Sequence, residues 1–234
     1  MTAKLASLRP IAWLVSIGML VGLVAIFTWV PTDCGMTVNG ACFQGSIQRM
    51  FYVHVPSAWV SYLAFTIVLI GSFSYLRSGR DKWDHVAHAS AEIGVVFTAI
   101  TLVTGMIWGK PVWGAFWRWE PRLTTTLVMF LIYVGYLTFR SMATDTTRGS
   151  RIASVIGMAG FINVPIVHFS VQWYRGQHPL PVVVNPQEGA QLPVEMLITL
   201  LYMVALFSLM YATLLALRVR LGRLEAQVET LEAI

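Results

Sequence analysis

Six long runs of apolar residues follow one another along the chain, and short polar stretches separate them. The runs cover residues 11–30, 55–76, 91–108, 123–139, 152–171 and 193–217. A helix that crosses about 30 Å of hydrocarbon needs about 20 apolar residues, so each run is long enough to span a membrane. The pattern predicts an all-α integral membrane protein, with one membrane domain of six transmembrane helices over residues 1–234. The first run lacks a cleavage-like ending, so we interpret it as a retained span rather than a signal peptide.

The apolar periodicity continues beyond the sixth run, over residues 218–234. Leu221, Leu224, Val228 and Leu231 follow one another at spacings of three, four and three residues. This spacing places them on one face of a helix, so the tail is predicted to be an amphipathic extension of the sixth span. Two interpretations stay open for this face: a docking surface for a cytoplasmic partner, or a solvated extension.

The basic residues are distributed unevenly between the two sides of the predicted membrane domain. Of the 16 lysines and arginines, 11 lie in the two ends of the chain and in the second and fourth loops, and five lie on the other side. Basic residues favour the cytoplasmic side, so both termini are predicted to be cytoplasmic and the loop between the third and fourth runs is predicted to face outward. This asymmetry explains the net charge of +5, which therefore does not indicate nucleic-acid binding.

Between the third and fourth runs lies a stretch that is too polar for a membrane span and too aromatic for an ordinary loop. Residues 108–122 hold four of the nine tryptophans. Trp113 and Trp117 are four residues apart and would share one face of a helix. Pro111 is suited to open that helix and Pro121 to end it. We predict a short outer Trp-rich helix or loop that forms a flat aromatic shelf, with three charged side chains near its far end: Arg118, Glu120 and Arg122.

Two interpretations of this stretch compete. Tryptophan is enriched at membrane–water interfaces, so one or two near a helix end need no further role. Four within a dozen residues, interleaved with charges and glycine, exceed such a belt and favour a surface for a planar ligand. A shelf of this kind can stack a large aromatic ligand or hold a cation over its ring faces.

Two histidines flank this stretch on the predicted outer side. His54 lies at the outer end of the second span, just before Pro56, and His178 lies in the third outer loop. Haem is a planar aromatic ligand whose iron takes axial imidazoles, so this combination of residues suits haem. Its propionates would need cationic partners, and three arginines on that side are candidates: Arg118, Arg122 and Arg175.

The other histidines favour simpler roles. His168 lies about a turn inside the outer end of the fifth span, which Pro165 is expected to kink, and a hydrogen-bonded packing role is favoured for it. His85 and His88 are three residues apart and would share a helical face, but we interpret them as solvated residues of the inner loop rather than a metal site. Glu92 follows near the inner end of the third span, and its partner is left open.

Both cysteines, Cys34 and Cys42, lie in the first outer loop. An oxidising compartment preserves disulfides, so one structural bridge is the hypothesis, and a catalytic dithiol is less favoured because the spacing exceeds the usual redox motif. No spacing in the chain favours zinc or a Ser or Cys nucleophile, and no glycine-rich loop is suited to cradle phosphates. The chain is therefore not expected to hydrolyse ATP itself.

Taken together, these residues resemble one known family. The stretch Trp108–Thr124 closely resembles the tryptophan-rich signature, or WWD domain, of the CcmC family, the haem exporter protein C of bacterial cytochrome c maturation. The segments His54–Ala58 and Asn163–Trp173 resemble that family too, and the likeness covers nearly the whole chain. Glu120 departs from the usual Asp, and Pro121 replaces a small residue. The two cysteines are not part of the family pattern.

The resemblance implies that haem b is held at the periplasmic face, between the Trp-rich loop and two axial histidines that map onto His54 and His178. The segment around His178 matches less well, so His168 is its competitor. Other haem contacts would come from the loop, with Glu120 orienting Arg122 or a chaperone side chain: Trp113, Trp117, Trp119, Glu120, Arg118 and Arg122. The implied partners are the ATPase CcmA, the membrane subunits CcmB and CcmD of an ABC transporter complex, and the chaperone CcmE, which receives the haem.

Three rival functions remain beside this one. A haem lyase-type ligation component would have more spans and further membrane histidines. A b-type electron-transfer membrane protein would need paired histidines inside the bundle, and only His168 lies near such a place. A transporter for a cationic aromatic substrate is the third. A Soret band separates haem from the last alternative, and slow rather than fast redox cycling separates haem handling from electron transfer.

Overall fold

An antiparallel pair of long helices, α3 (Phe51–Ser78) and α4 (Asp81–Trp113), forms the centre of the molecule. The computed structural model describes residues 9–32, 37–38, 41–42, 44–143, 146–174, 176–178 and 192–232. The remaining elements are α2 (Arg9–Thr28), β1 (Thr37–Val38), β2 (Ala41–Cys42), η1 (Ser46–Met50), α5 (Pro121–Met142), α6 (Thr146–Phe161), α7 (Asn163–Trp173) and α8 (Val194–Glu232).

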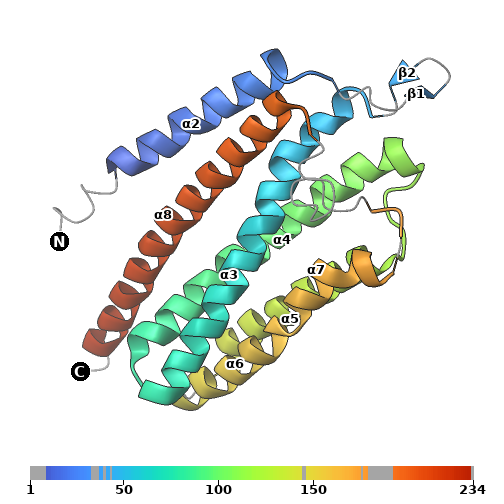
Figure 1. Cartoon of the computed structure of the whole chain (residues 1–234). Coiled ribbons are helices and arrows are strands. Elements are labelled where there is room, and N and C mark those ends of the chain that lie inside the picture. The colour runs from blue at the N-terminus through green and yellow to red at the C-terminus, as the bar shows by residue number, and fades with distance from the viewer. Residues whose placement is uncertain are drawn as a thin grey trace.

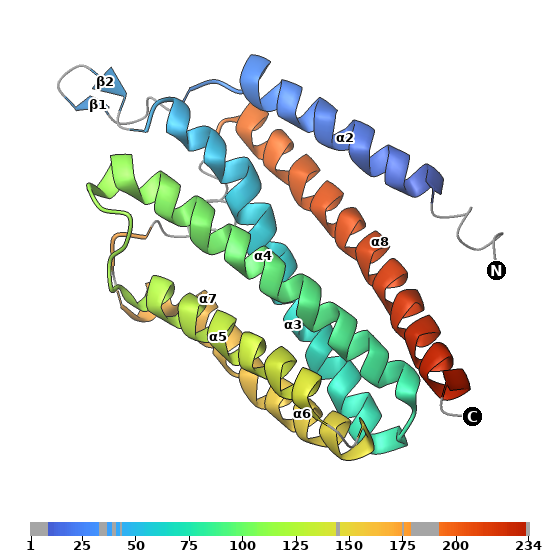
Figure 2. The ribbon, with the colours of Figure 1, turned by 180° about the vertical axis from the view of Figure 1, so that it is seen from behind.

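The helices surround the central pair on two sides. α5, α6 and α7 pack along one side of α3 and α4, whereas α8 packs along the other and carries α2 on its outside (Figures 1 and 2). α2 starts and α8 ends at the end of the bundle away from the loop between α4 and α5 (Figure 1). Within the described part of the chain, β1 and β2 form a two-residue antiparallel hairpin between α2 and η1.

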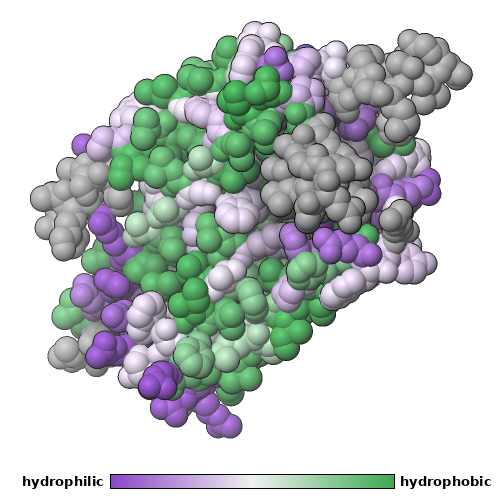
Figure 3. Space-filling model, in the orientation of Figure 1, coloured by the Kyte–Doolittle hydropathy of each residue, from purple (hydrophilic) through white to green (hydrophobic). Residues whose placement is uncertain are grey.

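Six stretches of helix are long and apolar enough to cross a membrane, which confirms the predicted all-α membrane architecture. Large apolar side chains are exposed along these helices, as on α2, where Trp13 is 69% and Leu20 is 64% exposed. Hydrophobic residues cover the middle of the face in Figure 3, and hydrophilic residues gather towards its two ends. A surface of this kind matches a lipid environment, so the chain is a multi-pass membrane protein.

Two apolar clusters hold the bundle together. The first joins α2, α3, α4 and α8, and the second joins α3 and α4 to α5, α6 and α7. Phe65 of α3 stacks on Tyr133 of α5 with ring centroids 3.6 Å apart. Ser90 of α4 donates to the Ala64 carbonyl of α3 at 2.8 Å, so it accepts from the Tyr211 hydroxyl of α8 at 2.7 Å. Close packing of this kind fixes the positions of the outer helix ends.

Several helix bounds differ from the sequence prediction. α4 begins at Asp81, so His85 and His88 lie on a helix rather than in a solvated loop. The fifth span is divided into α6 and α7 at Ile162. Pro165 has no N–H to donate to the Phe161 carbonyl, which accounts for the break. α8 has 39 residues and continues through the periodic tail.

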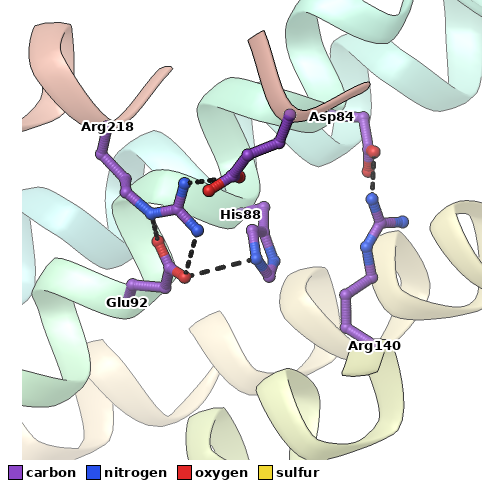
Figure 4. A network of polar contacts seen from close by, with 6 residues as sticks. Asp84, His88, Glu92, Arg140 and Arg218 are labelled. Atoms are coloured by element: carbon purple, nitrogen blue, oxygen red, sulfur yellow. Dashed lines mark hydrogen bonds and ion pairs between the residues drawn. The ribbon is translucent and has the colours of Figure 1, made fainter. Parts of the chain in front are cut away.

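A buried ion pair closes the end of the bundle away from the Trp-rich loop. Asp84 of α4 pairs with Arg140 of α5 (Figure 4). Ser150 of α6 donates a hydrogen bond to Asp84 at 3.0 Å. Arg140 also donates to the hydroxyl of Ser150. These contacts tie three helices together at the ends where their backbone carbonyls and amides need partners.

A second polar cluster joins α4 to α8. Arg218 of α8 binds both carboxylate oxygens of Glu92, at 2.6 and 2.9 Å, and contacts Glu225 at 3.1 Å (Figure 4). His88 lies 3.5 Å from Glu92 on the same helix face. The partners of Glu92, which the sequence left open, are therefore Arg218 and His88.

Candidate functional site

The Trp-rich stretch is a loop between two helices, and the helix predicted from Pro111 to Pro121 is wrong. α4 continues through Pro111 to Trp113. Gly114 then adopts a left-handed conformation with φ of 77°, and its N–H donates to the Lys110 carbonyl at 3.0 Å. Glycine takes this conformation without a steric penalty, so it ends the helix at Trp113.

Pro121 begins a helix rather than ending one. It occupies the start of α5, directly after the N-cap residue Glu120. A proline fits the first turn of a helix because its missing N–H would have no partner there. Trp113 and Trp117 consequently lie on different backbone elements and do not share a helical face.

The tryptophan rings form two edge-to-face pairs instead of the flat shelf that we predicted. Trp108 and Trp113 have ring centroids 5.0 Å apart at 86°, and Trp117 and Trp119 have centroids 5.5 Å apart at 78°. Trp119 is 77% exposed and Phe116 is 53% exposed. The loop therefore presents a stepped aromatic surface where α4 ends and α5 begins.

Three polar atoms beside this aromatic surface are buried and have no hydrogen-bond partner among the residues that the structure describes. They are Nε1 of Trp117, Oε1 of Glu120 and Nε of Arg122. An unpaired buried polar atom costs about 1–3 kcal/mol, so such atoms need a reason. A ligand that combines an aromatic plate with carboxylates would contact the rings and offer acceptors to the two N–H donors, which is the combination that haem has.

His54 lies in the first turns of α3 and is partly buried against α4. Its Nδ1 lies 3.0 Å from Oγ1 of Thr104. The Thr104 hydroxyl donates its hydrogen to a backbone carbonyl of the preceding turn, that of Ile100, at 2.7 Å. Thr104 therefore accepts at His54, so Nδ1 carries the hydrogen and Nε2 keeps a free lone pair. A Cβ at Gly105 would lie 3.1 Å from the His54 ring, so glycine leaves the ring its space.

His178 lies beside the start of α5 because Glu120 holds the backbone of its loop. Oε2 of Glu120 accepts from the N–H of Gln177 at 2.8 Å and from the N–H of His178 at 3.2 Å. A Cβ at Gly176 would lie 2.5 Å from the same oxygen, so only glycine permits this approach. The sequence prediction for Glu120, that it orients Arg122 or a chaperone side chain, did not include these two backbone contacts. That role stays a prediction.

Arg122 connects the cluster. Its Nη1 donates to Nδ1 of His178 at 3.3 Å, and its Nη2 donates to the carbonyl of His168 at 3.0 Å. Arg122 also lies close enough to His54 for an electrostatic interaction. One guanidinium thus contacts both α7 and the loop that follows it. Its positive charge also acts on His54, the other predicted axial ligand.

The other predicted residues lie further from this cluster or outside the description. Arg118 is exposed, and its Nη2 donates to the Trp113 carbonyl at 2.6 Å. Arg175 lies outside the described residues. The ring of His168 is exposed and lies edge-to-face with Phe169, with centroids 4.9 Å apart. His168 offers the cluster its backbone carbonyl.

An apolar hollow of about 420 Å³ lies between α4 and α5, on the surface that faces lipid. Its wall includes Val96, Val103 and Phe130, and it reaches Thr104, the partner of His54. Thr104 is thus the residue that the wall of the hollow shares with the surroundings of His54.

Sequence reasoning missed Thr104, Gly105 and Gly176. A polar residue in an apolar span was the available signal for Thr104, because α4 carries buried threonines at 98, 101 and 104. Neither glycine had a signal, since their roles depend on contacts with residues distant in the chain. Cys34 and the side chain of Cys42 lie outside the described residues, so the bridge stays a prediction.

No group of three or more His, Cys, Asp or Glu side chains that could hold a metal ion occurs within the described ranges. His85 donates from Nδ1 to the Asp81 carbonyl at 2.7 Å, and His88 contacts Glu92 at 3.5 Å. Both inner histidines therefore have partners of their own.

Known proteins match this chain over most of its length. The family model described as Heme exporter protein C matches residues 2–234. Heme exporter protein C of Bradyrhizobium diazoefficiens is 36% identical over 81% of this chain and 72% of its own. The protein of that name from Haemophilus influenzae is 33% identical over 95% and 86%. A putative cytochrome c biosynthesis ccmC-like mitochondrial protein of Marchantia polymorpha is 40% identical over 70% and 68%.

The matched region contains α3, the Trp-rich loop, and the segment that carries His168 and His178. The family match covers the six helices and the Trp-rich loop alike. The chain belongs to the haem exporter protein C (CcmC) family.

Proposed function

We propose that the chain binds haem b at its outer face and presents it for transfer to a periplasmic haem chaperone during the maturation of c-type cytochromes. Family membership supports a role in haem handling. The observation that carries the proposal is the cluster of Glu120, Arg122 and His178, which joins the end of the Trp-rich loop to the loop after α7. This cluster adds an imidazole and a cation to the aromatic surface.

Each group has a separate part in holding haem as a cargo. His54 offers Nε2 to the iron on one side, and His178 is the second axial ligand. The indole rings of Trp113, Trp117 and Trp119 contact the porphyrin, at about 1–3 kcal/mol for each stacked ring by analogy with base stacking. Arg122 pairs with a propionate, for which a guanidinium fork is well suited.

The haem is handed on, so the chain is a binding and transfer platform rather than an enzyme. Its partners in this proposal are the chaperone CcmE, the ATPase CcmA and the membrane subunits CcmB and CcmD. The chain lies in the bacterial inner membrane with both termini in the cytoplasm, because the basic residues favour that orientation. The tail of α8 then projects on the side of the ATPase.

The test measures haem retained by the purified full-length protein, from the Soret absorbance relative to protein concentration. His54→Ala and His178→Ala should each lower the retained haem, because each removes an axial ligand. His168→Ala is the matched control and should keep it, since this residue contributes its backbone carbonyl to the cluster. Loss of haem with His168→Ala alone would contradict the ligand assignment.

A further inference from the structure

The two predicted axial histidines are held in opposite hydrogen-bonding states. A neutral imidazole has one N–H donor and one lone pair, and iron can bind only at the lone pair. The partner of one ring nitrogen therefore decides whether the other nitrogen can bind the metal.

His54 is already in the binding state. Nδ1 donates to Thr104, because the Thr104 hydroxyl spends its own hydrogen on the Ile100 carbonyl. The lone pair is then on Nε2, which is the nitrogen that haem-binding histidines commonly use. A hydrogen bond from the opposite nitrogen also fixes the orientation of the ring.

His178 is in the other state. Its Nδ1 faces Nη1 of Arg122 at 3.3 Å. A guanidinium has five N–H donors and no acceptor, so Nδ1 must accept with its lone pair, and the hydrogen is on Nε2. The Nε2 atom then has no lone pair for iron, and the lone pair on Nδ1 is occupied by Arg122.

We propose that Arg122 is a latch that keeps His178 from binding iron until a carboxylate of the ligand takes the guanidinium away. This inference rests on the proposed function and concerns the order of events at that site. A carboxylate forms a shorter, charge-assisted bidentate pair with arginine, which is stronger than one contact of 3.3 Å to a neutral ring. Once Arg122 has turned to the carboxylate, the His178 hydrogen can move to Nδ1 and the lone pair to Nε2.

The surroundings of Arg122 suit this exchange of partners. Its Nε is buried without a hydrogen-bond partner among the described residues, so part of its donor capacity is unused. Its Nη2 donates to the His168 carbonyl, which holds the guanidinium beside the middle of α7. Glu120 meanwhile accepts from the backbone N–H groups of Gln177 and His178, so the His178 ring can be released while the loop stays in place.

The latch requires a free carboxylate on the ligand, whereas ring stacking and iron ligation do not. A porphyrin without carboxylates would bind to His54 and the aromatic rings but would leave Arg122 on His178. Ferric protoporphyrin IX and its dimethyl ester share the ring and the iron, and only the first has free carboxylates. Comparing the two therefore isolates the role of the carboxylate.

The experiment uses the full chain in detergent micelles, with electron paramagnetic resonance and near-infrared magnetic circular dichroism to report the axial ligands. The wild-type chain should give a low-spin, bis-imidazole spectrum with the diacid and a high-spin, one-imidazole spectrum with the dimethyl ester. Arg122→Leu should give the low-spin spectrum with the ester as well, because His178 is then released.

Lys110→Leu is the matched control. It removes one positive charge from the same loop region, but its ammonium group contacts the Gly114 carbonyl and the Phe116 ring. This variant should resemble the wild type and give the high-spin spectrum with the ester. A low-spin ester complex in the wild type, or a high-spin one in Arg122→Leu, would overturn the latch.

A second measurement needs no ligand and no Arg122 variant. Nitrogen-15 NMR of the histidine-labelled protein distinguishes the two ring tautomers, and His54→Ala and His178→Ala assign the signals. His54 should carry its hydrogen on Nδ1 and His178 on Nε2. A His178 signal with the hydrogen on Nδ1 would also refute the latch.

These outcomes separate the two proposals. If the diacid and the ester both bind through two histidines, the latch fails and haem binding stands. If diacid binding survives the loss of both His54 and His178, the proposed function itself fails at the level of its ligands.

Discussion

Hydrogen-bond partners of single residues decide what the outer site can do. His54, Arg122 and Glu120 each make hydrogen bonds to residues far away in the sequence, among them Thr104, His178 and Gln177. None of these contacts adds much burial, but each fixes which atom is a donor and which is an acceptor. A substitution that keeps shape and changes only that property is therefore the most informative test.

Thr104→Val is such a substitution. It keeps the volume of the side chain and removes the acceptor for His54 Nδ1. Loss of a partner that orients a metal ligand typically lowers affinity by about 10–100-fold, so haem affinity should fall within that range in a spectroscopic titration.

The control for this variant is Thr98→Val on the same helix. Thr98 is fully buried, and its hydroxyl donates to the Gly94 carbonyl rather than to a histidine. Its haem affinity should match that of the wild type. Equal losses in both variants would mean that Thr104 acts through helix packing and not through His54.

Contacts between elements set the geometry that these residues need. α4 reaches from the ion pair at Asp84 to the start of the Trp-rich loop at Trp113, so one rigid helix connects the two ends of the bundle. The Asp84–Arg140 pair fixes α4 against α5, and the side chain of Asp84 is only 9% exposed. α4 and α5 are also the two helices that the Trp-rich loop connects.

Asp84→Ala should destabilise the fold. Removing one partner of a buried ion pair leaves an uncompensated charge, at a cost of about 3–5 kcal/mol. Denaturation of the purified protein, followed by circular dichroism, measures this loss. The double variant with Arg140→Ala should recover part of it, because the unpaired charge is then removed as well.

Asp81→Ala is the comparison on the exposed first turn of the same helix. An acidic residue at that place contributes at most about 1 kcal/mol through the helix dipole. Similar losses for Asp81→Ala and Asp84→Ala would contradict the structural importance of the buried pair.

At the scale of the whole molecule, the six apolar helices could be predicted because the signal is long and local. The site could be predicted only in part. The residue types His54, Trp117 and Arg122 were found by composition and by a family resemblance. Their arrangement could not be predicted in the same way. Gly114 ends α4 by a left-handed turn and Pro121 starts α5. In the sequence alone, Gly114 could also lie inside a helix and Pro121 could also end one. The Arg122–His178 contact joins positions 56 residues apart, beyond any local pattern.

The orientation of the whole molecule is open to a direct test. Trp119→Cys and Arg223→Cys place single thiols at exposed positions of the outer loop and of the α8 tail, after the two native cysteines are replaced by serine. A membrane-impermeant maleimide should label the first in spheroplasts and the second only after permeabilisation, as the basic-residue asymmetry predicts. The reverse pattern would invert the proposed topology.

α2 packs against α8 through close contacts at Gly18 and Gly22, where an added Cβ would lie within 2.8 Å of Leu206 and 2.6 Å of Met203. Tyr202 also donates to the Gly18 carbonyl at 2.8 Å. α2 precedes α8 in the chain, and translation adds about 5–20 residues per second. The glycine face of α2 therefore stays uncovered in the bilayer until α8 has been made, and a truncation before α8 would leave that face without the helix that packs on it.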